Sequence, residues 1–348
     1  MKESKFSIGL TADFYDENGN TLYEDIGLCV FEKYSHIVLS KFAESKTEIT
    51  SDQLSDHNVA FVLSPNVTAN SLTENEEHLL AISRFGVGYD NVDVEACTTN
   101  DVLVLIAEGA VNRSVAEATI TWMLALTHNV LEKDQLVRTG RWNDRNQLMG
   151  SELREKTLGV IGFGGIGKAL VDLLNGFGMK KAIVYDPGLT KDICSRFEVT
   201  HVEKLDELLM ESDFVSLHCP LNEDTRGLIG NRQLKLMKST AYLLNLSRGG
   251  IVDEEALYNA LLNQTISGAA IDCFEGEPIL SPHRFGRLNN VILAPHSIAW
   301  TNELFRDIGR TACKSMLDLS FGKRPRGVVN PEVFESSNFN RKWARFVA

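Results

Sequence analysis

The sequence predicts an α/β protein in which parallel sheets are covered by helices, and three observations lead to this class. Short apolar runs alternate with stretches of helical pattern along most of the chain. These runs end in polar residues, as parallel strands do where their carboxyl ends open into loops. A glycine-rich turn stands between one run and a helix. With 348 residues, the chain is long enough for two domains that each have a core.

The apolar runs form two series separated by a long helix. The predicted strands of the first series are KFSIGLTAD, AFVLSP, AISRFG and DVLVLIAEG. Ser114 to Leu131 has helical spacing, and Ser114 with Glu117 predicts a capping box at its start. The second series is TLGVIGFG, KAIVYDP, DFVSLHCP, AYLLNLS, GAAIDCF and NVILAPH. From Thr301 the pattern is helical again.

Charge and cysteine content argue against several classes of protein. The 35 Lys and Arg residues against 47 Asp and Glu residues give a net charge of −12, which is unfavourable for a nucleic-acid or anionic-membrane surface. The six cysteines are scattered without a C-x-x-C pair, so we expect reduced thiols, no disulfide framework and no metal site. No signal-peptide core opens the chain, and no run reaches the ~18 apolar residues of a membrane span. We therefore expect a cytoplasmic protein.

The glycine turn predicts a dinucleotide site. Gly162-x-Gly164-x-x-Gly167 follows an apolar strand and precedes a helix. In this context Gly162 allows the tight turn, Gly164 lets the backbone approach a pyrophosphate, and Gly167 packs the helix on the strand. The phosphates would lie at the positive end of that helix.

Asp186 predicts which dinucleotide binds. It ends the next strand, KAIVYDP, and stands 19 residues after Gly167 (186 − 167), close to the expected spacing of about 20. A carboxylate there accepts hydrogen bonds from ribose hydroxyls and repels a 2′-phosphate, which indicates NAD rather than NADP. The alternative is a solvated acid at a strand end.

Three later strands end in chemically useful groups. Arg248 follows AYLLNLS, Glu277 follows GAAIDCF, and His296 follows NVILAP. An arginine fork binds a substrate carboxylate, a histidine exchanges the proton of a hydroxyl, and a glutamate orients the ring and favours its protonated form. The alternatives are structural: Arg248 paired with Asp253 or Glu254, a core histidine, and a Glu-Pro turn.

These residues lie in segments that resemble the D-isomer-specific 2-hydroxyacid dehydrogenase family. The signature segments are NLSRGGIVDEEAL, GAAIDCFEGEP and LAPHSIAW, and further matches are FGVGYDNVD, SVAEATI and HCPLNEDTRGLI. The resemblance covers roughly residues 59–331, and several separate motifs occur in order.

The resemblance implies a role for each candidate site residue. Arg248 would bind the substrate carboxylate and carbonyl, His296 would be the general acid/base, and Glu277 its partner. Backbone at Val87 and Gly88 would bind the carboxylate from the other domain. The residues expected to bind the cofactor are Gly162, Gly164, Gly165, Ile166, Gly167, Asp186, Cys219, Pro220, Thr225, Leu246, Ser247 and Asp272.

The resemblance also implies an architecture. Two Rossmann-like or flavodoxin-like parallel-sheet domains would flank an active-site cleft. The NAD-binding Rossmann domain, 107–298, would be inserted into a substrate-binding domain made of 1–106 and 299–348. The family usually forms homodimers through the NAD domain.

Two departures narrow the expected substrate. Phosphoglycerate dehydrogenases usually carry an arginine where this chain has Leu63, and formate dehydrogenases of this fold have glutamine where it has Glu277. The short tail after VVNPEV leaves us expecting no added regulatory domain. We therefore predict an NAD-dependent oxidoreductase for a small, unphosphorylated D-2-hydroxy acid or its 2-keto acid. The main alternative is a dinucleotide-sensing corepressor or scaffold of the same fold; an enzyme for a substrate outside the hydroxy acids is the third.

Overall fold

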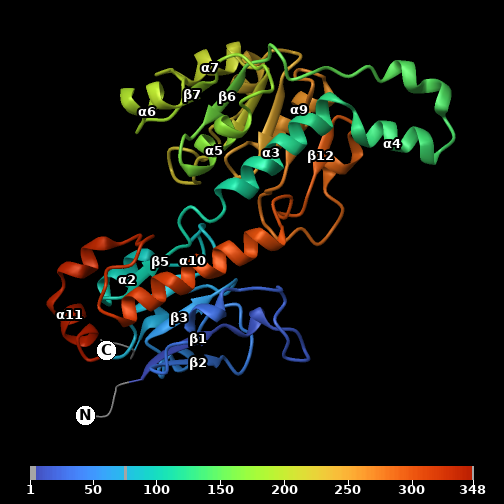
Figure 1. Cartoon of the computed structure of the whole chain (residues 1–348). Helices are drawn as coiled ribbons and strands as arrows, with labels where there is room; N and C mark the ends of the chain where they lie inside the picture. The colour runs from blue at the N-terminus through green and yellow to red at the C-terminus, as the bar shows by residue number, and fades with distance from the viewer. Residues whose placement is uncertain (1–4, 74–76, 347–348) are drawn as a thin grey trace. The chain divides into compact units, whose positions relative to one another are not determined.

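The computed structural model describes residues 5–73 and 77–346 and divides into two compact units. One unit contains Met1–Val111 and Thr301–Ala348, and the other contains Asn112–Trp300 (Figure 1). Each unit contains a single parallel sheet with helices, so the predicted α/β class is confirmed. No helix in these described ranges is long and apolar enough to cross a membrane.

The first unit has a five-stranded parallel sheet in the order β2-β1-β3-β4-β5. This is the flavodoxin-like order, in which the chain winds to one edge and then to the other. The strands are β1 (Phe6–Leu10), β2 (Ile37–Lys41), β3 (Val59–Val62), β4 (Ala81–Arg84) and β5 (Leu103–Leu105).

Both faces of this sheet are covered. Phe61 belongs to one buried cluster, and its strand neighbours Ala60 and Val62 belong to another, as alternation along a strand requires. The first cluster includes the apolar stripe of the long helix α10 (Asn302–Ser320), which Thr301 caps by accepting the Leu304 N–H. The other helices of the unit are α1 (Ser51–Leu54), α2 (Val94–Thr99), α11 (Ser337–Trp343), and the 3₁₀ turns η1 (Ala12–Phe14), η2 (Leu28–Phe31), η3 (Asn70–Leu72) and η6 (Pro331–Glu335).

The second unit has a seven-stranded parallel sheet in the order β12-β11-β10-β9-β6-β7-β8. The chain starts in the middle at β6, runs to one edge at β8, and returns to fill the other side from β9. This is the Rossmann winding, whose order reverses between β6 and β9. The strands are β6 (Leu158–Ile161), β7 (Ile183–Tyr185), β8 (Thr200–His201), β9 (Phe214–Leu217), β10 (Tyr242–Asn245), β11 (Gly268–Ile271) and β12 (Val291–Leu293).

Helices cover both faces of the second sheet. On one face α3 (Asn112–Thr127) buries Trp122 and Met123 with Val160 of β6 and Leu170 of α5 (Gly165–Leu173). On the other face α7 (Leu205–Glu211), α8 (Asn231–Leu236) and α9 (Glu254–Leu262) pack on Val215, Leu243 and Ile271. The remaining elements are α4 (Val130–Arg138), η4 (Trp142–Gln147), α6 (Lys191–Arg196) and η5 (Arg284–Arg287).

The helix predicted from Ser114 to Leu131 differs from the observed one. The helix α3 begins at Asn112, so Ser114 lies inside its first turn and the predicted capping box is wrong. The Glu117 carboxylate instead accepts from the Arg113 side chain, at 2.5 Å. The helix ends at Thr127, and Asn129 adopts a left-handed backbone with φ of 51° before α4 begins. Asparagine tolerates this conformation better than most residues, which is why the helical pattern is interrupted there.

Candidate active site

The residues of the second unit predicted to form a site lie at one edge of its sheet. All seven strands are parallel, so their carboxyl ends meet at that edge. Gly162 directly follows β6, Asp186 directly follows β7, and Cys219 is the second residue after β9. Arg248, Asp272 and His296 stand in the loops after β10, β11 and β12. The edge therefore joins a dinucleotide turn to several polar side chains.

The turn between β6 and α5 has the geometry that its glycines predict. Gly162 has φ of 87°, and a Cβ there would lie 2.6 Å from the backbone nitrogen of Cys219. A Cβ on Gly167 would lie 2.8 Å from the Gly162 carbonyl oxygen, so helix and strand approach closely. Gly164 is the N-cap of α5 and faces open space. Gly165 and Ile166 begin that helix, whose free N–H groups favour an anion.

The Asp186 side chain forms a hydrogen bond with the backbone of this turn, so it is not simply a solvated acid. Its Oδ2 accepts the Phe163 N–H at 2.7 Å, and its Oδ1 accepts the Gly188 N–H at 2.8 Å. The carboxylate therefore stands beside the glycine turn, where the ribose of a bound dinucleotide lies in this fold.

Hydrogen bonds within the loop after β9 hold its two ends together. The Thr225 hydroxyl donates to the Pro220 carbonyl at 2.6 Å and accepts the Asn222 N–H at 2.8 Å. Cys219 packs over Gly162, and burial raises the pKa of its thiol to about 11. The thiol is therefore protonated at neutral pH.

His218 was not among the predicted site residues. It is partly buried just after β9, where its backbone lies beside Gly162, and its Nε2 lies 2.8 Å from the Ser216 hydroxyl oxygen. Burial lowers its pKa to about 4, so the ring is neutral at neutral pH. The preceding run DFVSL and the following Cys-Pro gave no sign that the imidazole faces inward.

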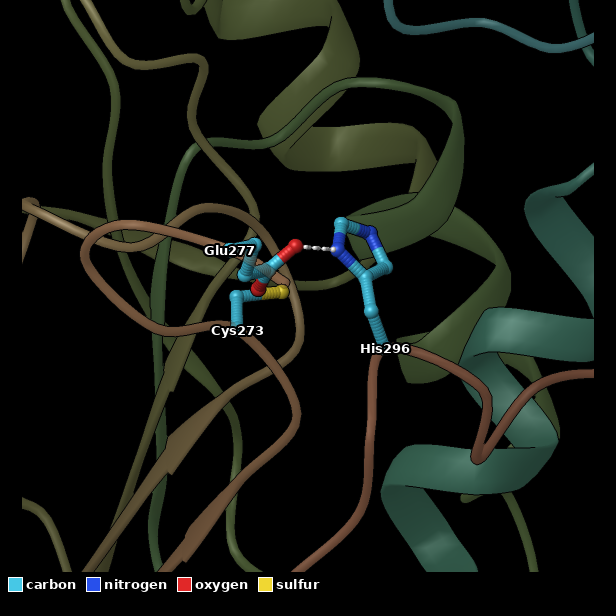
Figure 2. Close-up of side chains that lie close together, drawn as sticks. All are labelled: Cys273, Glu277 and His296. Carbon is cyan, nitrogen blue, oxygen red and sulfur yellow. Dashed lines mark hydrogen bonds and ion pairs between the residues drawn. The ribbon is translucent and has the colours of Figure 1, made fainter. Parts of the chain in front are cut away.

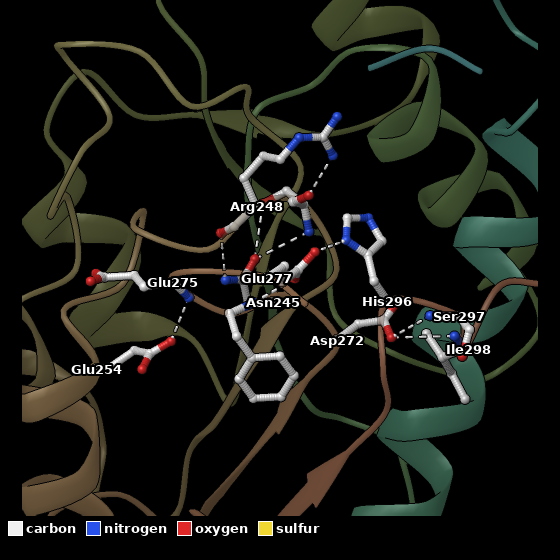
Figure 3. Close-up of polar contacts among 11 residues, drawn as sticks. Asn245, Arg248, Glu254, Asp272, Glu275, Glu277, His296, Ser297 and Ile298 are labelled. Atoms are coloured by element: carbon white, nitrogen blue, oxygen red, sulfur yellow. Dashed lines mark hydrogen bonds and ion pairs between the residues drawn. The ribbon is translucent and has the colours of Figure 1, made fainter. Parts of the chain in front are cut away.

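A buried asparagine shapes the turn that carries Arg248. The Asn245 Oδ1 accepts the Ser247 N–H and hydroxyl at 3.1 and 2.9 Å, and its Nδ2 donates to the Arg248 carbonyl at 2.9 Å (Figure 3). Leu246, between them, is buried. The Arg248 Nη1 donates to the Ser247 carbonyl at 2.7 Å. Asn245 stands inside an apolar strand run, LLNLS, and that placement was the available signal.

The two acids considered as structural partners of Arg248 are engaged elsewhere. Asp253 caps α9 by accepting the Ala256 N–H at 2.9 Å. Glu254 accepts the Glu275 N–H at 2.8 Å, and its other oxygen lies 3.2 Å from the His283 Nε2. Glu254 thereby supports the loop that contains Glu277.

Glu277 and His296 form a pair. The Glu277 Oε2 lies 2.7 Å from the His296 Nδ1, and its Oε1 accepts the Phe274 N–H at 2.7 Å (Figure 3). Burial acts to raise the pKa of Glu277, but the hydrogen bonds from His296 and Phe274 outweigh it and lower that pKa. An ionised carboxylate therefore holds the Nδ1 of the histidine, and the Nε2 takes no part in this contact.

Backbone contacts fix the position of His296. Its N–H donates to the Asp272 carbonyl at 2.8 Å, and its φ of 52° is in the left-handed region. This conformation is uncommon for a residue with a side chain and costs energy, so the surroundings must hold it. The buried Asp272 carboxylate does so, because its Oδ1 accepts the N–H groups of Ser297 and Ile298 at 2.8 and 3.3 Å. Burial raises the pKa of Asp272, against the lowering effect of these two bonds.

In the first unit, Val87 and Gly88 lie in the turn after β4. Arg84, which ends that strand and was not predicted, donates from Nε to the Gly88 carbonyl at 2.9 Å. Its Nη1 also donates to the Val62 carbonyl at 3.1 Å and to the Leu63 carbonyl. Arg84 thus ties the loop after β3 to the turn after β4. In the sequence it is one more polar residue at a strand end, with nothing to mark this contact.

The comparisons with known proteins agree on one family. The model described as "D-isomer specific 2-hydroxyacid dehydrogenase, NAD binding domain" matches residues 120–297. A glyoxylate reductase of Thermococcus litoralis is 34% identical over 318 residues, which cover 89% of this chain and 95% of that protein. The chain belongs to the D-isomer specific 2-hydroxyacid dehydrogenase family.

Other members and solved structures extend this result. A D-3-phosphoglycerate dehydrogenase of Methanocaldococcus jannaschii is 39% identical over 279 residues, which cover 80% of this chain but 53% of that protein. The D-isomer specific 2-hydroxyacid dehydrogenase from Lactobacillus delbrueckii ssp. bulgaricus, solved in its NAD complexed form, is 25% identical with a TM-score of 0.73. That match covers 93% of this chain and 100% of that one. The cofactor of the present protein is NAD, and the matched NAD-binding domain lies in its second unit.

Asp186 offers a test of cofactor choice in this dehydrogenase. We expect NADH to be preferred to NADPH, and Asp186→Ala to reduce the ratio of the two kcat/KM values by about tenfold or more, because like charges brought together cost several kcal/mol. Asp186→Asn is the matched variant, since it keeps the size and one acceptor for the Phe163 N–H. Equal use of both cofactors by the unmodified protein would contradict the assignment of Asp186.

Proposed function

We propose that the protein interconverts a small, unphosphorylated D-2-hydroxy acid and its 2-keto acid with NAD as cofactor. The observation that carries this proposal is the 2.7 Å contact between Glu277 and His296, at the same sheet edge as Arg248 and the glycine turn. A protein that only senses a dinucleotide needs the turn and Asp186, but it has no use for an oriented histidine.

Each residue of this set has a distinct task. NADH, when bound, supplies the hydride that reduces C2 of the keto acid. The Arg248 guanidinium binds the substrate carboxylate and the carbonyl oxygen, because its fork matches two oxygens at once. His296 donates a proton from Nε2 to the carbonyl oxygen as the carbon is reduced. In the opposite direction the neutral Nε2 accepts the hydroxyl proton, and Glu277 stabilises the resulting imidazolium.

Several predicted residues would complete the site. The Asp272 Oδ2 would accept a hydrogen bond from the carboxamide of the nicotinamide, since the Oδ1 already accepts the N–H groups of Ser297 and Ile298. Leu246 and Ser247 would line the nicotinamide, and Cys219, Pro220 and Thr225 the path of the diphosphate. Backbone N–H groups at Val87 and Gly88 would bind the substrate carboxylate, held in place by Arg84.

The substrate class rests on the relatives and on Leu63. Several relatives are glyoxylate reductases and others are D-3-phosphoglycerate dehydrogenases. Leu63 offers an apolar side chain where a phosphate would need a cation, which favours an unphosphorylated substrate. Glyoxylate and hydroxypyruvate are the smaller candidates, and bulkier 2-keto acids are the larger ones.

A panel of 2-keto acids with NADH tests the proposal. We expect loss of nicotinamide absorbance with at least one unphosphorylated acid, and little with 3-phosphohydroxypyruvate. NADH binding without turnover of any acid in the panel would support the corepressor or scaffold instead.

We also propose a homodimer formed through the NAD-binding unit. The segment of α4 and η4 extends away from the sheet of that unit (Figure 1). It exposes a set of large apolar side chains: Val130, Leu131, Val137, Trp142 and Met149. Several large apolar side chains exposed along one segment favour a role for it in a protein interface. Sedimentation equilibrium of the purified protein decides the matter, and a mass of one chain at micromolar concentration would exclude the dimer.

The proposed location is the cytoplasm, in which thiols stay reduced. All six cysteines are free in the structure: Cys29, Cys97, Cys194, Cys219, Cys273 and Cys313. We propose no nucleic-acid or membrane partner, in line with the net charge of −12.

A further inference from the structure

Three metal-ligating side chains meet at the acid/base pair. Cys273 stands one residue beyond Asp272 after β11, and only 2% of it is exposed. One ligand atom each from Cys273, Glu277 and His296 lies within 4.8 Å of the other two. Figure 2 shows the Cys273 sulfur turned toward the side of the Glu277 carboxylate on which His296 lies.

The chemistry of this set selects a particular kind of ion. Thiolate sulfur, imidazole nitrogen and carboxylate oxygen are the ligands that Zn²⁺ takes in proteins, with a fourth position open to water. Mg²⁺ and Ca²⁺ prefer sites made of oxygen alone, so a sulfur and a nitrogen discriminate against them. Zinc sites that are open to solvent usually have three protein ligands, with water in the fourth coordination position.

The distances are close to those that zinc requires. Bonds of about 2.0 to 2.3 Å in a tetrahedron place neighbouring ligand atoms roughly 3.3 to 3.7 Å apart. Since the three ligand atoms lie within 4.8 Å of one another, zinc requires any of these distances to shorten by no more than about 1 Å. The Nδ1 and Oε2 atoms must separate from 2.7 Å, and both side chains can move, because 45% of the His296 side chain and 31% of the Glu277 side chain are exposed.

We propose that Cys273, Glu277 and His296 bind Zn²⁺ as an inhibitory ion that replaces the shared proton of the acid/base pair. On binding, the Cys273 thiol and any protonated ring release protons to solvent, and coordinate bonds form from sulfur, oxygen and nitrogen. No electron is transferred. Binding depends only on these three side chains, whereas the inhibition rests on the proposed function, because a ring that holds zinc no longer exchanges its proton with a substrate.

Two effects oppose the ion, and the ligands offset them. Burial raises the pKa of the Cys273 thiol, so zinc must displace a bound proton. Arg248 lies near enough to act on the charges of both Cys273 and Glu277, and its positive charge repels a cation. The thiolate and the carboxylate together contribute two negative charges, which balance those of Zn²⁺.

The test compares the full-length protein with Cys273→Val, which keeps the volume nearly constant and removes the sulfur. Cys29→Ser is the control, since Cys29 is an exposed thiol of the first unit. Zinc affinity is measured by competition with a chromophoric chelator. Co²⁺ is added separately, because a cobalt–thiolate bond gives a charge-transfer absorption that does not depend on activity. Cys273→Ala, circular dichroism and NADH titration guard against a folding defect of the valine variant.

We expect one zinc per chain in the unmodified protein and in Cys29→Ser. Cys273→Val should weaken zinc binding by about tenfold or more, because even the loss of a residue that only hydrogen-bonds to a metal ligand lowers metal affinity by about 10- to 100-fold. The cobalt absorption should disappear in Cys273→Val. Zinc should inhibit the unmodified protein more strongly than Cys273→Val, when the activity of each protein with zinc is divided by its own activity without zinc. Equal affinity in Cys273→Val and the unmodified protein, or the absence of bound zinc, would overturn the site. Zinc that binds through Cys273 in a protein without activity toward any keto acid would uphold the site and refute the proposed function.

Discussion

Arg248→Lys is expected to lower kcat/KM for a 2-keto acid by about a hundredfold or more, as the loss of one donor to a reacting oxygen does in other enzymes. Lysine keeps the positive charge but not the planar fork, so it binds one oxygen where arginine binds two. Its ammonium also lacks the rigid geometry that the Asn245-supported turn presents at this position.

The measurement is steady-state kinetics together with a separate titration of NADH. We expect the Kd of NADH to change by about twofold or less, since substrate-binding groups contribute little to binding of the cofactor alone. Arg232→Lys is a suitable control, because that arginine makes an exposed pair with Asp206. Near-normal kcat/KM in Arg248→Lys would return Arg248 to a structural role.

His296→Gln is expected to lower kcat by about 10²- to 10⁴-fold in both directions, the usual contribution of a positioned general acid or base. Glutamine can still form a hydrogen bond with Glu277, but it cannot hold and release a proton near neutral pH. The loss should appear in reduction and in oxidation alike, because the same atom donates in one direction and accepts in the other.

His201→Gln is the matched control for this substitution. His201 lies in the exposed edge strand β8, away from the strands that carry Arg248 and His296. NADH titrations with both variants separate a lost proton transfer from a damaged cofactor site. A His296→Gln protein that keeps more than about a tenth of normal kcat would disprove general acid–base catalysis by this residue.

Much of the fold could be predicted because its signals are local. The glycine turn requires a positive φ at Gly162 and close approach at Gly167, and the six residues from Gly162 to Gly167 are enough to predict both. Buried strands such as those in AFVLSP and DFVSLHCP are near-continuous apolar runs, as is typical of strands covered on both faces. The edge strands β2 and β8 were missed; β8 has only two residues, both exposed, whereas β2 begins with the apolar run Ile37-Val38-Leu39, which could have indicated it.

The parts of the site that were not predicted depend on contacts between distant segments. Arg248, Glu277 and His296 were found because each follows a recognisable strand, and parallel strands bring their ends together. Cys273 was considered only as a scattered thiol, since nothing in its spacing from His296 indicates a distance below 5 Å. The supporting contacts of Asn245, Glu254 and Arg84 are likewise set by tertiary structure.

The low pKa of His218 has a consequence for stability in acid. Its pKa is about 4 in the folded protein and 6.5 in the unfolded chain, so between these values the unfolded state binds more protons. The contribution of His218 to the stability of the NAD-binding unit is therefore fully present above pH 6.5 and is lost as the pH drops toward 4, by about 3 kcal/mol. Moderate acidification should thus weaken the unit at the carboxyl end of β9, beside Gly162 of the glycine turn.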